Sequence, residues 1–160
     1  MIFVTVGEQL PFDRLIRVMD QWAVQQPHRI FAQIGRSSYR PSHIEYKQFL
    51  EQREFRQRMQ EAQFIVAHAG MGTIISALEM GKPIIVMPRR ASLGEHRNDH
   101  QLTTARRFLS LQYVLMALDE NELWQRLSDM ATSKDFQWSR RKIGSSPILI
   151  KTIRDFMVSD

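Results

Sequence analysis

Short apolar runs alternate with amphipathic segments along most of the chain. Runs rich in β-branched residues and bounded by Gly, Pro or polar clusters are typical of buried strands. Segments whose apolar positions recur every three or four residues are typical of helices. We therefore expect strands at 2–6, 29–34, 64–67, 84–87 and 113–118, with a strand or extended segment at 44–49. We expect helices at 12–22, 51–62, 73–80, 101–109, 120–130 and 148–157.

Alternating strands and helices predict a doubly wound, Rossmann-like α/β fold built on a parallel sheet. The stretch 64–87 would form one right-handed strand-helix-strand unit of that sheet. All 160 residues fit a single domain without internal repeats, and the basic, patternless stretch 134–146 is expected to be mobile. Ligands of such folds bind beyond the carboxyl ends of the strands.

The most informative stretch is a strand-to-helix turn near the middle of the chain. The apolar run 64–67 breaks at Gly70 and Gly72 and is followed by the helical pattern 73–80. Glycine lets the backbone approach a ligand and take a positive φ, and the helix start offers unpaired N–H groups and a partial positive charge. The turn predicts a phosphate or diphosphate seat, although the two glycines could serve only a tight turn.

One helix face extends this predicted site. Thr73, Ser76 and Glu79 recur every third residue, so they share a polar face on an otherwise apolar helix. A nucleotide with its phosphates at the helix start would bring its ribose near this face. Glu79 could equally be a solvated surface acid.

Two further loops are predicted at the same edge of the sheet. Gly7 ends the first strand, and Arg89 follows the strand 84–87. The next stretch, 91–101, is the most polar of the chain, as expected of a loop that recognises sugar hydroxyls. Asn98 or Asp99 could instead only cap the following helix. The candidates from these loops for binding the nucleotide and an attached sugar are Gly7, Arg89, Asn98, Asp99, His100 and Gln101.

Composition limits the cellular locations and the kinds of partner that we expect for this chain. The net charge of +5 is compatible with anionic ligands, anionic lipid surfaces or nucleic acid. Basic residues are not interleaved with aromatic ones as in a nucleic-acid platform, so no nucleic-acid partner is expected. The absence of cysteine excludes disulfides and thiolate metal sites, and the chain starts in a strand-like run without a basic leader. No apolar run is long enough to span a membrane, so we expect a cytoplasmic location.

Several reaction classes lack their motifs in this sequence. The glycine turn carries Ile75 where a dinucleotide fingerprint needs its third glycine, and neither a P-loop nor a G-x-S-x-G elbow occurs. His96 and His100 are four apart but lack the H-E-x-x-H pattern, so no metal is expected. A nucleotide-sugar site for glycosyl transfer remains, with the sugar nucleotide as substrate and no cofactor.

At this point five motifs resemble, in order, the C-terminal domain of glycosyltransferase family 28. They are Val4-Thr-Val-Gly7 with Phe12-Asp13, Gln33-Ile-Gly35, His68-Ala-Gly-Met-Gly-Thr73, Gly81-Lys-Pro83 and Asp99-His-Gln101. The likeness covers roughly residues 1–110. It is greatest to the single-domain branch, which includes the catalytic subunit of the dolichol-linked N-acetylglucosaminyltransferase and bacterial exopolysaccharide glycosyltransferase subunits.

The resemblance implies the donor-binding half of a GT-B glycosyltransferase, which transfers a GlcNAc-like hexose from a UDP-sugar. It implies a lipid-linked acceptor and a membrane-associated partner subunit that supplies the other half, at the inner face of the membrane. The incomplete cleft leaves a face that this partner or a second copy of the chain would cover. The implied contacts are Gly70, Met71, Gly72 and Thr73 beside the diphosphate and Gln101 on the hexose hydroxyls.

Two features depart from a complete enzyme. The family's ribose-binding glutamate falls on Ser76, which lacks the charge-assisted grip of a carboxylate, and the nearest acid is Glu79. The general base is not evident: His68 and Glu95 are the catalytic candidates, with His96 and His100 as further imidazoles. His68 could equally be a buried histidine tied to the backbone. A non-catalytic stabilising or regulatory subunit is therefore the alternative function.

Overall fold

The computed structural model describes residues 1–110 and 114–132. The basic stretch predicted at 134–146 and the helix predicted at 148–157 lie outside the described residues.

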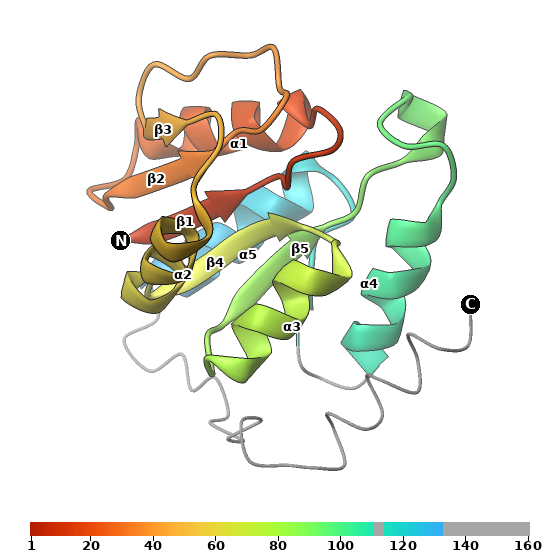
Figure 1. Ribbon diagram of the computed structural model, residues 1–160. Coiled ribbons are helices and arrows are strands. Elements are labelled where there is room, and N and C mark those ends of the chain that lie inside the picture. Colours follow the sequence, from red (N-terminus) through yellow and green to blue (C-terminus); the bar gives the residue numbers. More distant parts are fainter. Residues whose placement is uncertain (111–113, 133–160) are drawn as a thin grey trace.

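A parallel six-stranded sheet forms the centre of the described structure (Figure 1). Its strands stand in the order β3-β2-β1-β4-β5-β6, and every neighbouring pair is parallel. Their bounds are β1 Ile2–Thr5, β2 Ile30–Gln33, β3 Glu45–Lys47, β4 Phe64–His68, β5 Ile84–Met87 and β6 Leu115–Met116. This strand order is that of the doubly wound fold, so the predicted fold class is confirmed.

Helices cover both faces of the sheet. They are α1 Asp13–Ala23, α2 Gln52–Glu61, α3 Met71–Glu79, α4 His100–Ser110 and α5 Glu120–Thr132, with a 3₁₀ turn at Ala91–Leu93. The helices α1 and α5 pack on one face, and α2, α3 and α4 pack on the other (Figure 1). Because side chains alternate along a strand, Ile2 and Val4 enter one core and Phe3 enters the other. Burial on both faces explains why the strands are continuously apolar.

Most predicted elements are present with small shifts at their ends. The helix predicted from residue 73 begins at Met71, so Gly72 lies in its first turn and not before it. The ambiguous segment 44–49 contains a strand, β3, whose three residues are exposed because it is an edge strand. Within the strand predicted at 113–118, the described residues begin at 114, and Leu115–Met116 form β6.

The chain changes direction between the two central strands. β1 and β4 are hydrogen-bonded neighbours, with Thr5 opposite Ala67. The chain leaves β1 toward α1 on one face and leaves β4 toward α3 on the other. A doubly wound sheet opens a crevice at such a switch point, because the two loops diverge.

The loop after β2 is fastened to α1 by one buried carboxylate. Asp20 is 1% exposed and accepts hydrogen bonds from Tyr39 Oη at 2.7 Å and from the backbone N–H groups of His43 at 2.7 Å and Ser42 at 3.1 Å. Burial alone would raise the pKa of Asp20, but the hydrogen bonds from Tyr39, His43 and Ser42 outweigh it and lower the pKa. The folded state therefore favours the ionised carboxylate.

We predict that Asp20→Asn lowers the free energy of unfolding by about 2–3 kcal/mol at pH 7, because it removes charge-assisted hydrogen bonds from a buried acceptor. The folded pKa is the lower one, so this stabilisation is present above the unfolded pKa and is lost as pH falls through the folded value. Urea unfolding of both proteins between pH 7 and 3 measures the difference, which should shrink in acid. Asp129→Asn, on the exposed side of α5, is the matched control. An equal loss in both variants, or a difference independent of pH, would contradict the assignment.

Candidate functional site

A pocket of about 610 Å³ lies at the carboxyl-terminal edge of the sheet. Its walls come from the ends of β1, β2 and β4, from the loops after β1, β3, β4 and β5, and from the N-terminal parts of α2, α3 and α4. The loops that the sequence predicted to meet at one edge therefore do so.

Two glycines enclose the imidazole of His68 at the back of this pocket. A Cβ atom on Gly70 would lie 2.1 Å from His68 Nε2, and one on Gly7 would lie 2.9 Å from His68 Cε1. Gly7 has φ +73°, a conformation that glycine adopts readily. Gly70 has φ −84° and so does not need a left-handed backbone, contrary to our expectation for the turn. The close approach of His68 is what requires a glycine at position 70.

The surroundings of His68 keep its ring neutral. Burial lowers its pKa to about 4, and the nearby positive charge of Arg89 acts in the same direction. Its Nδ1 lies 3.5 Å from the carbonyl oxygen of Thr5. At neutral pH the imidazole has a low affinity for protons, which is a disadvantage for the general base that the sequence suggested.

The first turn of α3 borders the pocket. Gly72, Thr73 and Ser76 line it, and no side chain caps the helix start at Gly70. A Cβ atom on Gly72 would meet nothing within 4 Å, so the backbone there is bare toward the open space. The N–H groups of a first turn have no partner within the helix and suit an anion.

Two other residues of α3 lie elsewhere than the sequence suggested. Met71 packs its side chain against the core formed with α2 and α4, so only its backbone is available to a ligand. Glu79 is exposed and lies outside the pocket lining, because each third residue moves about 4.5 Å along the helix axis, away from its first turn. Of the predicted polar face, Thr73 and Ser76 reach the pocket.

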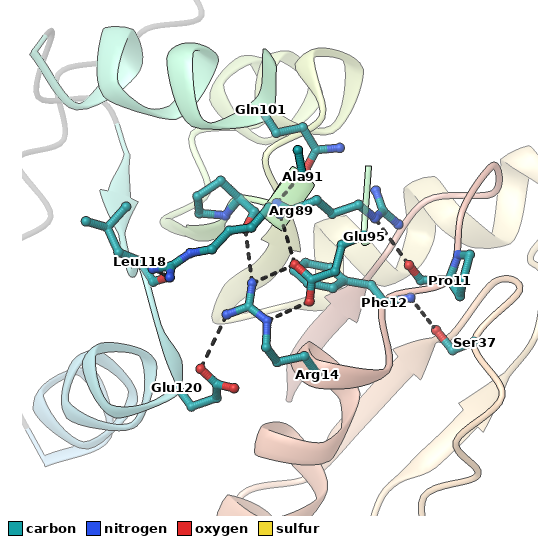
Figure 2. Close-up of polar contacts among 12 residues, drawn as sticks. Pro11, Phe12, Arg14, Ser37, Arg89, Ala91, Glu95, Gln101, Leu118 and Glu120 are labelled. Carbon is teal, nitrogen blue, oxygen red and sulfur yellow. Dashed lines mark hydrogen bonds and ion pairs between the residues drawn. The ribbon is translucent and has the colours of Figure 1, made fainter. Parts of the chain in front are cut away.

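Arg89 is buried beneath the loop after β1 and determines the shape of that loop (Figure 2). It is 3% exposed, and its Nη2 donates to the carbonyl oxygens of Val6 and Leu10, both at 2.7 Å. Its guanidinium also lies 5.0 Å from the ring centroid of Phe12. Burial lowers the pKa of Arg89 to about 10, so it stays charged at neutral pH. Its charge lines the pocket, but its hydrogen bonds go to the protein backbone.

Gln101, at the start of α4, is the one residue of 98–101 that lines the pocket. Its Oε1 accepts a hydrogen bond from the backbone N–H of Arg89 at 3.2 Å (Figure 2). Asn98, Asp99 and His100 are exposed outside the lining. Asn98 Oδ1 accepts the His100 N–H and Asp99 Oδ1 accepts the Ala91 N–H, so both side chains shape the loop.

The second catalytic candidate, Glu95, is part of an ion-pair network outside the pocket lining (Figure 2). Its carboxylate binds Arg14 through two hydrogen bonds of 2.6 and 2.8 Å and accepts the Arg90 N–H at 2.9 Å. Arg14 also reaches Glu120 at 3.3 Å. Glu95 therefore connects α1 and α5 to the loop after β5, and its oxygens are already hydrogen-bonded.

Sequence reasoning missed one wall of the pocket. Leu50, Gln52 and Phe55, at the end of the β3–α2 loop and the start of α2, line it together with Gln33, whose Oε1 accepts the buried Thr5 hydroxyl at 3.0 Å. A usable signal was present: the carboxyl ends of parallel strands share one edge, so residues following the segment 44–49 had to lie there.

Two negative findings concern the described residues. In 1–110 and 114–132, no cluster of three or more His, Cys, Asp or Glu side chains is arranged to hold a metal ion. In the same ranges no helix has the length and apolar character needed to cross a membrane.

Comparison with known proteins identifies one family. The family described as glycosyltransferase family 28 C-terminal domain matches residues 1–152. Among curated proteins, the chain is 29% identical over 116 residues to the human UDP-N-acetylglucosamine transferase subunit ALG13, which is 66% of this chain and 10% of that protein. It is 29% identical over 97 residues to the Candida albicans subunit of the same name, which is 61% of this chain and 31% of that protein. The matches therefore span a third or less of these relatives.

Solved glycosyltransferases share the fold. The calicheamicin glycosyltransferase CalG4 superposes with a TM-score of 0.66 at 15% identity, covering 98% of this chain and 42% of that one. A variant of Os79 from O. sativa in complex with UDP gives a TM-score of 0.67 at 14% identity, covering 99% and 40%. The chain thus has the same fold as a part of each enzyme that makes up rather less than half of its length, in agreement with the predicted fold.

We predict opposite effects for the same substitution at the two glycines of the turn. Gly70→Ala should lower the free energy of unfolding by about 1–3 kcal/mol, because its Cβ would lie 2.1 Å from the His68 imidazole, a ring that also packs against Gly7. Gly72→Ala should be neutral or stabilising by up to about 1 kcal/mol, since it adds a helix-favouring residue in open space. Chemical unfolding of both variants measures this. Similar losses at the two positions would contradict the packing described.

Proposed function

We propose that this chain, which belongs to the family of glycosyltransferase family 28 C-terminal domains, binds the UDP-sugar donor of a hexosyl transfer reaction. The observation that carries the proposal is one shared cavity, in which the bare first turn of α3 and the amide of Gln101 line the same space. The donor is a substrate, and no cofactor is proposed.

The diphosphate is assigned to the first turn of α3. The N–H groups near Gly72 and Thr73 lie at the positive end of the helix dipole, where phosphate oxygens bind favourably. Without a Cβ atom at Gly72, a ligand can approach the backbone closely. The same groups stabilise the negative charge that develops on the departing diphosphate.

The uridine is assigned to the wall that α2 contributes. Leu50 and Phe55 offer apolar contact to the face of a base, and the amide of Gln52 offers both a donor and an acceptor to its edge. Ser76 lines the pocket and offers its hydroxyl to the ribose.

The sugar is assigned to Gln101. Because Oε1 of this residue accepts the Arg89 N–H, the amide orientation is fixed and Nε2 is left to donate to a hexose hydroxyl. The relatives carry N-acetylglucosamine transferase in their names, so a GlcNAc-like donor is the first to test.

The enzyme is proposed to be completed by a second subunit. The chain covers 40% of a solved relative that binds UDP, and its curated relatives are named as subunits. We propose that a membrane-associated partner contributes the acceptor half and a lipid-linked acceptor, in exopolysaccharide or glycolipid assembly at the inner face of the membrane. A homodimer is the alternative way to cover the open side of the cleft.

One observation favours a second candidate, a non-catalytic stabilising or regulatory subunit. Among the described residues that line the pocket, the acidic side chain is Glu8, on the loop after β1, and α3 contributes Ser76. The position at which the resemblance implies a ribose-binding glutamate thus holds a hydroxyl, and Glu79 is exposed. A subunit that had lost its chemistry would tolerate such a change.

We predict that the chain, with its partner where required, binds UDP and UDP-N-acetylglucosamine in calorimetric titrations. Gln101→Ala and Gln101→Glu should weaken the UDP-sugar by about tenfold and UDP much less, because each removes a donor to the sugar. Gln101→Glu keeps an oxygen for the Arg89 N–H, so it separates sugar binding from loop shape. Gln125→Ala on α5 is the control.

Two outcomes would change the proposal. Absence of UDP binding by the wild-type protein together with its partner would contradict donor binding. Full transferase activity of the complex carrying Gln101→Ala would favour the accessory subunit over the catalytic one.

A further inference from the structure

Three side chains that line the pocket can carry a positive charge: Arg89, His68 and His96. Two of them are committed elsewhere. The guanidinium of Arg89 donates to the carbonyl oxygens of Val6 and Leu10, and the burial that lowers the pKa of His68 to about 4 keeps that ring neutral. Of these three side chains, His96 is therefore the one left to provide a positive charge to an anion in the pocket.

His96 is held by its own loop with one ring nitrogen turned to the protein. Its Nδ1 lies 3.1 Å from both the carbonyl oxygen and the side-chain Oδ1 of Asn98, and the Asn98 N–H lies 3.4 Å from the same nitrogen. The two oxygens are nearer than the N–H and favour a proton on Nδ1, which leaves Nε2 available to a ligand. Asn98 Oδ1 also accepts the His100 N–H at 3.2 Å, and this second hydrogen bond fixes the Asn98 side chain that contacts the His96 ring.

His96 and the glycine turn belong to one pocket, since His96, His68 and Gly70 all line it. A Cβ atom on Gly70 would touch the His68 ring, and a positive charge on His96 contributes to the low pKa of His68. The half-buried His96 thus lines, from the loop after β5, the same pocket as the first turn of α3, to which the diphosphate is assigned.

We propose that His96, held by Asn98, is the protonatable contact for the diphosphate of the donor. This inference rests on the proposed function, because it assigns a further residue to the same site. Protonated on both nitrogens, the imidazole donates from Nε2 to a phosphate oxygen in a charge-assisted hydrogen bond. In its neutral form the same nitrogen offers a lone pair, which repels that oxygen. Donor binding therefore draws a proton onto His96.

The two acidic residues that flank His96 are engaged by other groups. Glu95 and Asp99 flank it in sequence, but Glu95 is paired with Arg14, and Asp99 accepts the Ala91 N–H. The titratable and charged groups that line the pocket or stand beside His96 in its loop are Glu8, His68, Arg89, Glu95, Arg97, Asp99 and His100.

The test is titration calorimetry of the full chain, with its partner where required, using UDP-N-acetylglucosamine. The diphosphate of this molecule has no group that titrates near neutrality, so proton uptake reports on the protein. Measured near pH 7 in two buffers of different ionisation enthalpy, the wild type should take up a fraction of a proton. Its affinity should be about tenfold weaker at pH 8 than at pH 6, as expected for loss of a charge-assisted hydrogen bond.

Three variants separate a charge effect from a structural one. His96→Gln should bind with no proton uptake and a flat pH profile. His96→Lys carries a fixed charge, so it should bind at pH 8 more tightly than the wild type, again without uptake. His43→Gln removes an exposed imidazole outside the pocket and should behave as the wild type.

The outcomes distinguish this inference from the proposed function. Proton uptake that persists in His96→Gln, or wild-type binding without uptake, would overturn the role of His96 while leaving donor binding intact. Failure of the wild type to bind either UDP or UDP-N-acetylglucosamine would overturn the proposed function and this inference together.

Discussion

The site depends on the close packing of one imidazole between two glycines. Gly7 follows β1 and Gly70 precedes α3, and the ring of His68 packs against both so closely that a Cβ atom on either residue would lie within 3.0 Å of it. This contact holds two diverging loops at a fixed separation at the switch point of the sheet. The first turn of α3 therefore lies beside the pocket with its backbone exposed to a ligand. The separation of the loops after β1 and β4 thus creates the space in which a ligand can bind.

Most charged side chains around the pocket shape its walls. Arg89 secures the loop after β1 through backbone carbonyls, and the Arg14–Glu95 pair joins α1 to the loop after β5. The hydrogen bonds of Arg89, Arg14 and Glu95 thus go to other groups of the protein. An anionic ligand is left with helix N–H groups, the field of the buried Arg89 and the imidazole of His96. Such fixed dipoles stabilise a departing diphosphate without reorganising when the bond breaks.

The sequence predicted the fold and the principal turn because both depend on local pattern. Continuous apolar strands and 3.6-residue periodicity identified the sheet, and the strand-Gly-helix transition located the turn. Contacts between residues far apart in the chain could not be predicted from the sequence pattern. Nothing local shows that Arg89 bonds to residues about 80 positions earlier, that Glu95 is paired with Arg14, or that Gly70 accommodates His68. Glu79 satisfied the spacing rule, but the helix carries it one turn past the pocket. The wall formed by Leu50 and Phe55 was missed because apolar residues after an edge strand carry no motif.

In the proposed complex a nucleoside diphosphate occupies the space between the first turn of α3 and the start of α4. The decisive experiment is a crystal structure of the protein with UDP. We expect phosphate oxygens within hydrogen-bonding distance of the Gly72 and Thr73 amides, and the uracil ring against Leu50 and Phe55. UDP bound at another surface, or a pocket closed by rearranged side chains with the phosphates remote from α3, would contradict it.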